Sequence, residues 1–112
     1  MSFYTVIKTE LKNRKYIVAA LSEMRKRGEI LKCEINEKKG IIEVDRDGDI
    51  IKVTQEKSGY HEVAGDARVV KPFSDRLKQV YALESIKDNL PIDFEIAKET
   101  ETAGEIQILL KG

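Results

Sequence analysis

The amino-acid sequence predicts an α+β fold in which a mostly antiparallel sheet carries two helices on one face. Three observations support this prediction. Short alternating apolar segments dominate the chain, two longer segments repeat their apolar residues at helical spacing, and turn residues separate consecutive alternating segments. The expected order is β-α-β-β-β-β-α-β-β. The length of 112 residues fits one domain, which we assign to residues 1–112.

The first two elements are a strand over residues 3–8 and a helix that follows Asn13 and ends at about Arg27. The strand segment alternates and is rich in β-branched and aromatic residues. Asn13 is a suitable helix N-cap, and Gly28 can adopt the left-handed backbone that ends many helices. One apolar stripe at helical spacing is expected to face the core, and it consists of Ile17, Ala20, Leu21 and Met24.

Four short strands follow, and the turns between them predict an antiparallel meander. Asp47-Gly48, between two alternating apolar segments, is a residue pair typical of tight hairpins. In the first of these strands Leu31, Cys33 and Ile35 share one face, so we expect Cys33 to be an inert core residue. The expected strand ranges are 30–35, 41–44, 50–54 and 60–64.

A second helix is predicted over residues 72–90. Pro72 fits the first turn of a helix, where its missing N–H has no partner to lose, and Pro91 ends the pattern. The broad apolar stripe of this segment is typical of a helix that lies over a sheet. Residues 98–104 are expected to form a charged loop. The last two strands are predicted at residues 92–96 and 105–110.

The composition argues against several classes of protein. Lys and Arg number 20, as do Asp and Glu, and this zero net charge argues against a nucleic-acid partner. No apolar run approaches the ~20 residues of a membrane span, and the N-terminus has no apolar leader segment. We therefore expect a cytoplasmic protein without membrane contact. Charged residues reach 36%, with many Lys and Glu and few Gln and Asn, so we also expect a thermophilic source.

Metal and cofactor chemistry has little support in the residues. The chain has one cysteine, which excludes an internal disulfide and a cysteine-built zinc or iron–sulfur site. Residues 43–54 resemble the start of a calcium-binding loop, but Thr54 stands where a bidentate Glu is required. We expect a solvated hairpin tip there instead, with weak cation binding as the alternative, and no cofactor.

His61 is the only histidine. A histidine can act as a general base near neutral pH, but such catalysis needs a positioned partner, and none stands nearby in the sequence. We expect a histidine at the surface or at the rim of the core. A small enzyme built around His61 and Asp66 stays open as a third hypothesis, although the sequence leans against enzymatic activity.

Two groups of residues are candidate binding sites. Residues 1–40 carry ten Lys and Arg against five Asp and Glu, a net charge of +5, which can attract an anion. The corresponding anion-binding set on the first helix is Arg14, Lys15, Arg25, Lys26 and Arg27, with a solvated helix face as the favoured alternative. The candidate partner-binding corner, with a simple turn as its alternative, consists of Tyr60, His61, Asp66, Arg68 and Tyr81.

Four segments also resemble, in order, those of a known family. They are residues 1–10, 60–66, 73–82 and 104–110. They are similar to the domain of unknown function numbered 1257, the hypothetical chloroplast reading frame thirty-five family of plastids, cyanobacteria and other bacteria. This chain is shorter around residues 55–72 and has no tryptophan, unlike plastid-type members. The resemblance supplies no catalytic residues. It implies an accessory role beside an ATPase of the AAA class or a small ferredoxin-like protein.

These observations lead to three ranked hypotheses for function. The first is a non-catalytic interaction or accessory module that binds a protein partner through an exposed sheet edge or through the corner near Asp66. The second is an anion or nucleic-acid binder that uses the basic first helix. The small enzyme is the third. Self-association is a further expectation, because a sheet covered on one face leaves its edges and its other face open.

Overall fold

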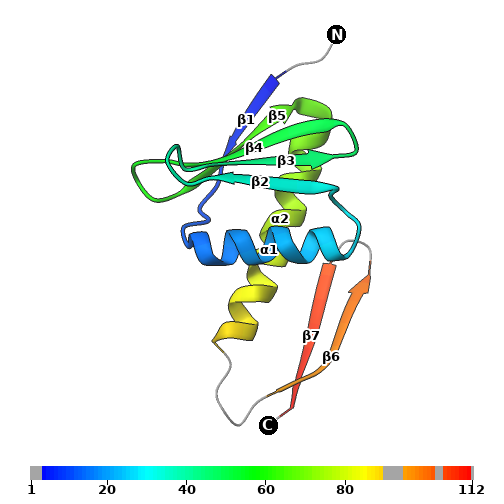
Figure 1. The fold of residues 1–112 in the computed structure, drawn as a ribbon. Helices are drawn as coiled ribbons and strands as arrows, with labels where there is room; N and C mark the ends of the chain where they lie inside the picture. The colour runs from blue at the N-terminus through cyan, green and yellow to red at the C-terminus, as the bar shows by residue number, and fades with distance from the viewer. Residues whose placement is uncertain (1–3, 90–94, 103–104, 112) are drawn as a thin grey trace.

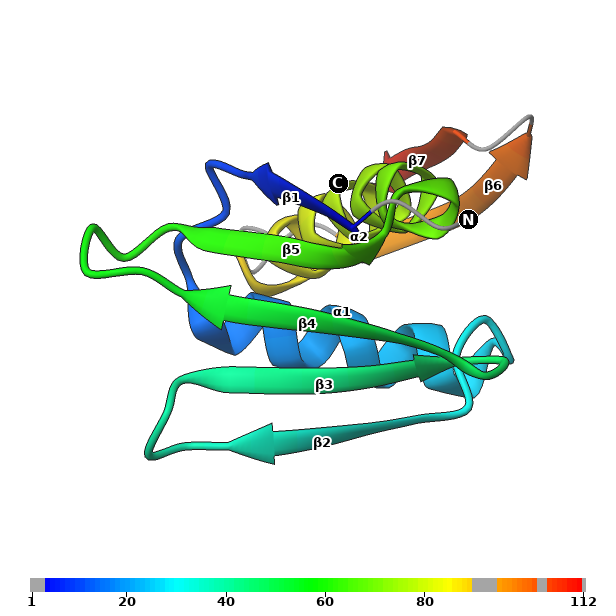
Figure 2. The same ribbon diagram turned by 90° about the horizontal axis from the view of Figure 1, so that it is seen from above.

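A five-stranded antiparallel sheet organises the fold, and the computed structural model describes residues 4–89, 95–102 and 105–111, with the side chains of residues 4–89. Figure 2 looks onto this sheet with the two helices behind it. From one edge to the other, the strands are β1 (Tyr4–Lys8), β5 (His61–Asp66), β4 (Asp49–Gln55), β3 (Ile41–Arg46) and β2 (Lys32–Asn36). The four strands from β2 to β5 form the predicted meander.

Both helices pack on the same face of the sheet, which confirms the predicted α+β architecture (Figure 1). Helix α1 (Arg14–Lys26) begins after Asn13, whose side-chain oxygen accepts the Lys15 backbone N–H at 3.0 Å. Helix α2 (Ala67–Asp88) is the longer one. All four residues of the predicted α1 stripe are buried: Ile17, Ala20, Leu21 and Met24.

The core lies between the helices and the inner face of the sheet. The strand register places Ile42, Val53 and Val63 side by side across β3, β4 and β5, and all three are fully buried. Helix α2 covers them with Phe73 and Leu77. Burial of each such side chain contributes about 1.5–3 kcal/mol, so this layer helps to stabilise the sheet.

Helix α2 begins five residues earlier than predicted, so the prediction that Pro72 opens the helix is wrong. Asp66 is the N-cap, and its carboxylate accepts the Arg68 N–H at 2.9 Å. Val70, inside the added turn, is fully buried. A cap contributes about 1 kcal/mol, and together with the burial of Val70 it outweighs the one backbone hydrogen bond that Pro72 removes.

The C-terminal strands form a separate hairpin. β6 (Glu95–Thr102) pairs antiparallel with β7 (Glu105–Lys111), and these two strands make their own sheet, with β7 against α2 (Figure 1). The predicted charged loop at 98–104 is therefore wrong over 98–102, because those residues pair with β7. Residues 90–94, where the second helix was predicted to end and the next strand to begin, lie outside the described residues.

The inner side of β2 is less buried than its alternation predicts. Leu31, just before β2, is 59% exposed and Ile35 is 42% exposed, while Cys33 is partly buried against the core. Figure 2 shows the cause, because α1 lies behind β4 and β3 and leaves β2 beyond it at the edge. The expected core position of Cys33 is therefore only partly correct. Within the described part of the chain, no helix has the length and apolar character to cross a membrane.

Candidate functional site

The edge of the sheet at β1 is open. The Thr9 N–H donates to the carbonyl oxygen of His61 at 3.0 Å, which fixes the phase of the β1–β5 ladder. Hydrogen-bonded pairs alternate along an antiparallel ladder, so every second residue directs its backbone groups away from the neighbouring strand. No other described strand lies beside β1. The residues whose backbone N–H and C=O groups face this open edge are Tyr4, Val6 and Lys8.

The outer face next to this edge, away from the helices, carries exposed apolar side chains. Tyr4 is 70% exposed, Val6 is 48% exposed and Ile50 on β4 is 50% exposed. Val6 lies directly opposite Ala64 on β5, and Lys52 on β4 lies on the other side of Ala64, where the apolar surface meets a charge. We call Tyr4, Val6, Ile50 and Ala64 the outer patch. Because the patch adjoins unpaired backbone groups, this region offers both hydrogen bonds and apolar contact to an incoming strand.

Asp66 and Arg68 flank the outer patch at the start of α2. Asp66 lies opposite Tyr4 in the strand register. The Arg68 guanidinium donates to both Asp66 carboxylate oxygens, at 3.1 and 2.9 Å. The hydrogen bond to the Asp66 carboxylate raises the pKa of Arg68. Two of the five residues predicted for the partner-binding corner therefore do lie beside the open edge, with Asp66 fixed by its capping role.

His61 is fully buried, so the prediction of a surface or rim histidine is wrong. β5 lies between β1 and β4, and its first, third and fifth residues face the core. The backbone N–H of His61 donates to the Leu11 carbonyl at 3.0 Å, and Nδ1 lies 2.8 Å from the same oxygen. Thr9 donates its hydroxyl to the His61 carbonyl at 2.7 Å. His61 thus anchors the connector of residues 9–13 between β1 and α1.

Tyr60 and Tyr81 lie near the same connector rather than near Asp66. The Tyr81 hydroxyl accepts the Asn13 backbone N–H at 3.0 Å, and its ring meets the Tyr16 ring edge-on with centroids 5.7 Å apart. The Lys12 ammonium lies 5.7 Å from the centre of the Tyr60 ring. The five residues of the predicted corner therefore lie in two places. Tyr60, His61 and Tyr81 contact the chain between β1 and α1, and Asp66 and Arg68 lie at the start of α2.

His61 and Asp66 do not share a site. They begin and end β5, so about 17 Å of strand separates them. They also point to opposite faces of the sheet, because five positions separate them in a strand of period two. Burial lowers the pKa of His61, although the Leu11 carbonyl opposes that shift and Arg14 adds to it. This geometry gives no pairing of the two groups for acid–base catalysis.

The basic residues of α1 also fall into separate groups. Arg14 reaches the Gly40 carbonyl at 3.5 Å, and Arg27 bonds Glu23 at 3.1 Å. Arg25 and Lys26 are exposed near the other end of the helix, about 16 Å from Arg14. A small anion cannot contact both groups at once, so the predicted anion-binding set is not a single site for a small anion.

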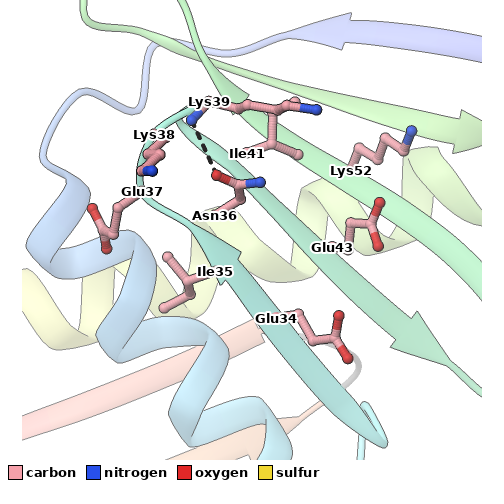
Figure 3. Close-up of a pocket in the computed structure, with 9 residues that line it drawn as sticks. All are labelled: Glu34, Ile35, Asn36, Glu37, Lys38, Lys39, Ile41, Glu43 and Lys52. Carbon is pink, nitrogen blue, oxygen red and sulfur yellow. Dashed lines mark hydrogen bonds between the residues drawn. The ribbon is translucent and has the colours of Figure 1, made fainter.

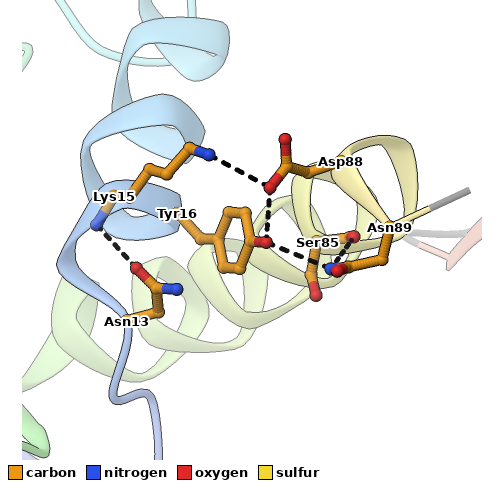
Figure 4. A network of polar contacts seen from close by, with 6 residues as sticks. All are labelled: Asn13, Lys15, Tyr16, Ser85, Asp88 and Asn89. Atoms are coloured by element: carbon orange, nitrogen blue, oxygen red, sulfur yellow. Dashed lines mark hydrogen bonds and ion pairs between the residues drawn. The ribbon is translucent and has the colours of Figure 1, made fainter.

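Lys15 belongs to a polar network that joins the two helices (Figure 4). The Tyr16 hydroxyl donates to Asp88 at 2.7 Å, and the Lys15 ammonium donates to the same carboxylate oxygen at 3.1 Å. Asn89 donates to the Tyr16 hydroxyl at 3.0 Å. The hydrogen bonds from Tyr16 and Lys15 lower the pKa of Asp88, and the hydrogen bond to Asp88 raises the pKa values of Tyr16 and Lys15. The network ties the end of α2 to the start of α1.

A shallow hollow of about 620 Å³ surrounds the β2–β3 hairpin (Figure 3). Glu34 and Glu43 face each other across the two strands, and Lys52 follows beside Glu43 on β4. Charges of both signs lie together, so the hollow has no single electrostatic preference for a ligand. Its lining is Glu34, Ile35, Asn36, Glu37, Lys38, Lys39, Ile41, Glu43 and Lys52.

The turn between β3 and β4 is the predicted hairpin tip. Asp47 and Gly48 have φ angles of 51° and 93°, as a tight two-residue hairpin requires. Asp45 accepts the Gly48 N–H at 2.9 Å. Among the described residues, no group of three metal-ligating side chains occurs, here or elsewhere.

Comparisons of the chain with protein-family models, curated proteins and solved structures found no match. The open edge of β1 was not singled out by the sequence. The alternation of residues 3–8 signals a strand, but only the pairing of β1 with β5, more than fifty residues later, shows that this strand ends the sheet. The resemblance to a family of unknown function stays a prediction.

Proposed function

We propose that this chain is a non-catalytic accessory module that binds a protein by adding a strand of that partner to the open edge of β1. The observation that carries the proposal is the coincidence of outward backbone groups at Tyr4, Val6 and Lys8 with the exposed outer patch. Strand addition uses both features, because main-chain hydrogen bonds supply affinity and alternate side chains supply specificity.

The partner class to test first follows from the resemblance to the family of unknown function. It is an ATPase of the AAA class or a small ferredoxin-like protein, in the cytoplasm. The divided basic residues and the separation of His61 from Asp66 give no specific support to the anion-binding and enzymatic alternatives, so we propose no second function.

The decisive variant is Val6→Pro. The Val6 N–H faces away from β5, so proline removes a donor from the open edge and leaves the β1–β5 ladder intact. Ile50→Lys is the matched control, because it changes the outer patch without touching the edge backbone. The probe is a phage-displayed library of random peptides, selected in parallel on the wild-type chain and on both variants.

We expect the wild-type chain to enrich peptides with alternating apolar residues, which bind extended. Val6→Pro should abolish binding of those peptides, whereas Ile50→Lys should weaken it. Circular dichroism spectra of the three proteins should match. The proposal is overturned if the wild-type chain enriches no peptides and shows no self-association, or if Val6→Pro, with an unchanged spectrum, retains full binding.

A further inference from the structure

We infer that the strand received by β1 comes from a second copy of this chain, in an antiparallel pairing whose two-fold axis passes through Val6. This inference rests on the proposed function, because it concerns the same edge, and a second copy bound there would take the place of the ATPase or ferredoxin-like partner. It follows from two features of β1: the phase of its backbone groups and the chemistry of its outward residues.

The phase of the ladder allows such an axis at Val6. A two-fold axis between antiparallel strands relates each residue to its counterpart about a fixed centre. With Val6 at the centre, Val6 of the partner subunit lies opposite, and Tyr4 meets the partner subunit's Lys8. All three residues direct N–H and C=O groups outward, so each opposed pair exchanges two hydrogen bonds. A centre at Thr5 or Ile7 would bring together groups that already bond β5.

The outward side chains are also self-complementary in this register. On the outer face, the two Val6 side chains meet between the two Ala64 side chains, which joins the outer patches into one apolar stripe. At each end, Tyr4 faces Lys8 of the partner subunit, a pairing of aromatic ring and cation. The chain already contains this pairing twice, with Lys12 5.7 Å from the Tyr60 ring centre and Lys15 5.8 Å from that of Tyr16.

Among the described strands, the other edge of the sheet, at β2, is also open but presents different residues. The Gln55 N–H donates to the Gly40 carbonyl at 3.0 Å, so Glu43 directs its backbone groups towards β2 and Glu34 bonds β3. The backbone groups of Cys33 and Ile35 therefore face the open edge of β2, and a pairing of two copies about either residue sets no aromatic ring opposite a lysine. The hairpin of β6 and β7 pairs within itself and does not extend the sheet at β1. The pairs of aromatic ring and cation therefore favour self-association at β1, where two five-stranded sheets would become one continuous sheet.

Sedimentation of the purified chain of residues 1–112 over a wide concentration range tests the inference. Because the contact is one short strand from each copy, we expect a reversible equilibrium in which the apparent mass rises from 12.8 kDa towards twice that value with concentration. Val6→Pro should hold the chain at the monomer mass. Ile50→Lys, which leaves the edge backbone unchanged, should still form dimers.

A second pair of variants tests the register and does not depend on proline. Tyr4→Lys places a lysine opposite the partner subunit's Lys8 and should weaken the dimer. Adding Lys8→Thr to that variant removes the like charge and should recover part of the association. No recovery in the double variant would overturn the axis at Val6.

The same measurements separate failure of this inference from failure of the proposed function. If the wild-type chain stays monomeric at every concentration, the inference that a second copy binds at β1 is overturned. If such a chain still enriches peptides in a Val6-dependent way, the proposed edge function stands with a different partner. A dimer that persists unchanged in folded Val6→Pro and Tyr4→Lys overturns the inference, because it must use another surface.

Discussion

The two faces of the five-stranded sheet follow different rules although they share the same strands. On the inner face, the row Ile42, Val53 and Val63 is fully buried under the helices. On the outer face, the neighbouring row begins with the two glutamates Glu34 and Glu43 and ends with Val6 at the open edge. Because neighbouring residues alternate between the faces, stability and recognition can change independently, one residue at a time.

The largest difference between the faces should appear on truncation of an aromatic residue. Phe73→Ala removes a buried ring that packs on the inner face, and it should lower the free energy of unfolding by about 3–5 kcal/mol. Tyr4→Ala on the outer face should change that free energy by less than about 0.5 kcal/mol under monomeric conditions. Urea unfolding of both variants measures the contrast, and equal losses would contradict it.

A second difference concerns pH, because the inner face contains the only histidine. Burial lowers the pKa of His61, so the unfolded chain takes up a proton at higher pH than the folded chain does. The free energy of unfolding should therefore fall as pH drops below about 6.5, by at most about 1.4 kcal/mol per pH unit from this group.

The variant His61→Gln isolates the contribution of the histidine to this pH dependence. It removes the titrating group, so its stability should vary less between about pH 5 and pH 7 than that of the wild-type chain. Urea titrations at several pH values provide the comparison. An identical slope in the variant and the wild-type chain would assign the pH dependence to other groups.

Local sequence patterns predicted the fold class, the meander, the α1 stripe and the Asp47-Gly48 hairpin tip, because each depends on neighbouring residues. The start of α2 was mispredicted, because the cap at Asp66 and the burial of Val70 outweigh the proline signal. The strand at 98–102 was also missed, because its charged composition suggests a loop and pairing with β7 decides its structure.

The candidate site was harder to predict than the fold because it depends on strand order. His61 was expected near the surface, but β1 covers β5 and turns that position into a buried anchor for residues 9–13. Asp66 and Arg68 were correctly placed beside each other, since they are two residues apart. Tyr81 was assigned to the wrong neighbour, because its contact with Asn13 spans 68 positions of the chain.

The smallest expected effect lies at the charged end of the outer face. Glu34 and Glu43 are directly opposed, and this repulsion is only partly offset by Lys52 beside Glu43 and by Lys32, 3.8 Å from Glu34. Glu34→Gln should therefore raise the free energy of unfolding by about 0.2–1 kcal/mol at low salt. Both glutamates are exposed, so salt should screen the repulsion and the gain should shrink as salt is added.

Glu37→Gln is the matched control for this last effect, because it removes the same charge from the adjoining turn without a carboxylate placed opposite. A gain of equal size in both variants would assign the effect to net charge rather than to the cross-strand pair. A gain confined to Glu34→Gln means that the outer face retains an unfavourable pair at low cost. On the inner face the same pair of like charges would be buried, and it would lower the free energy of unfolding several times more.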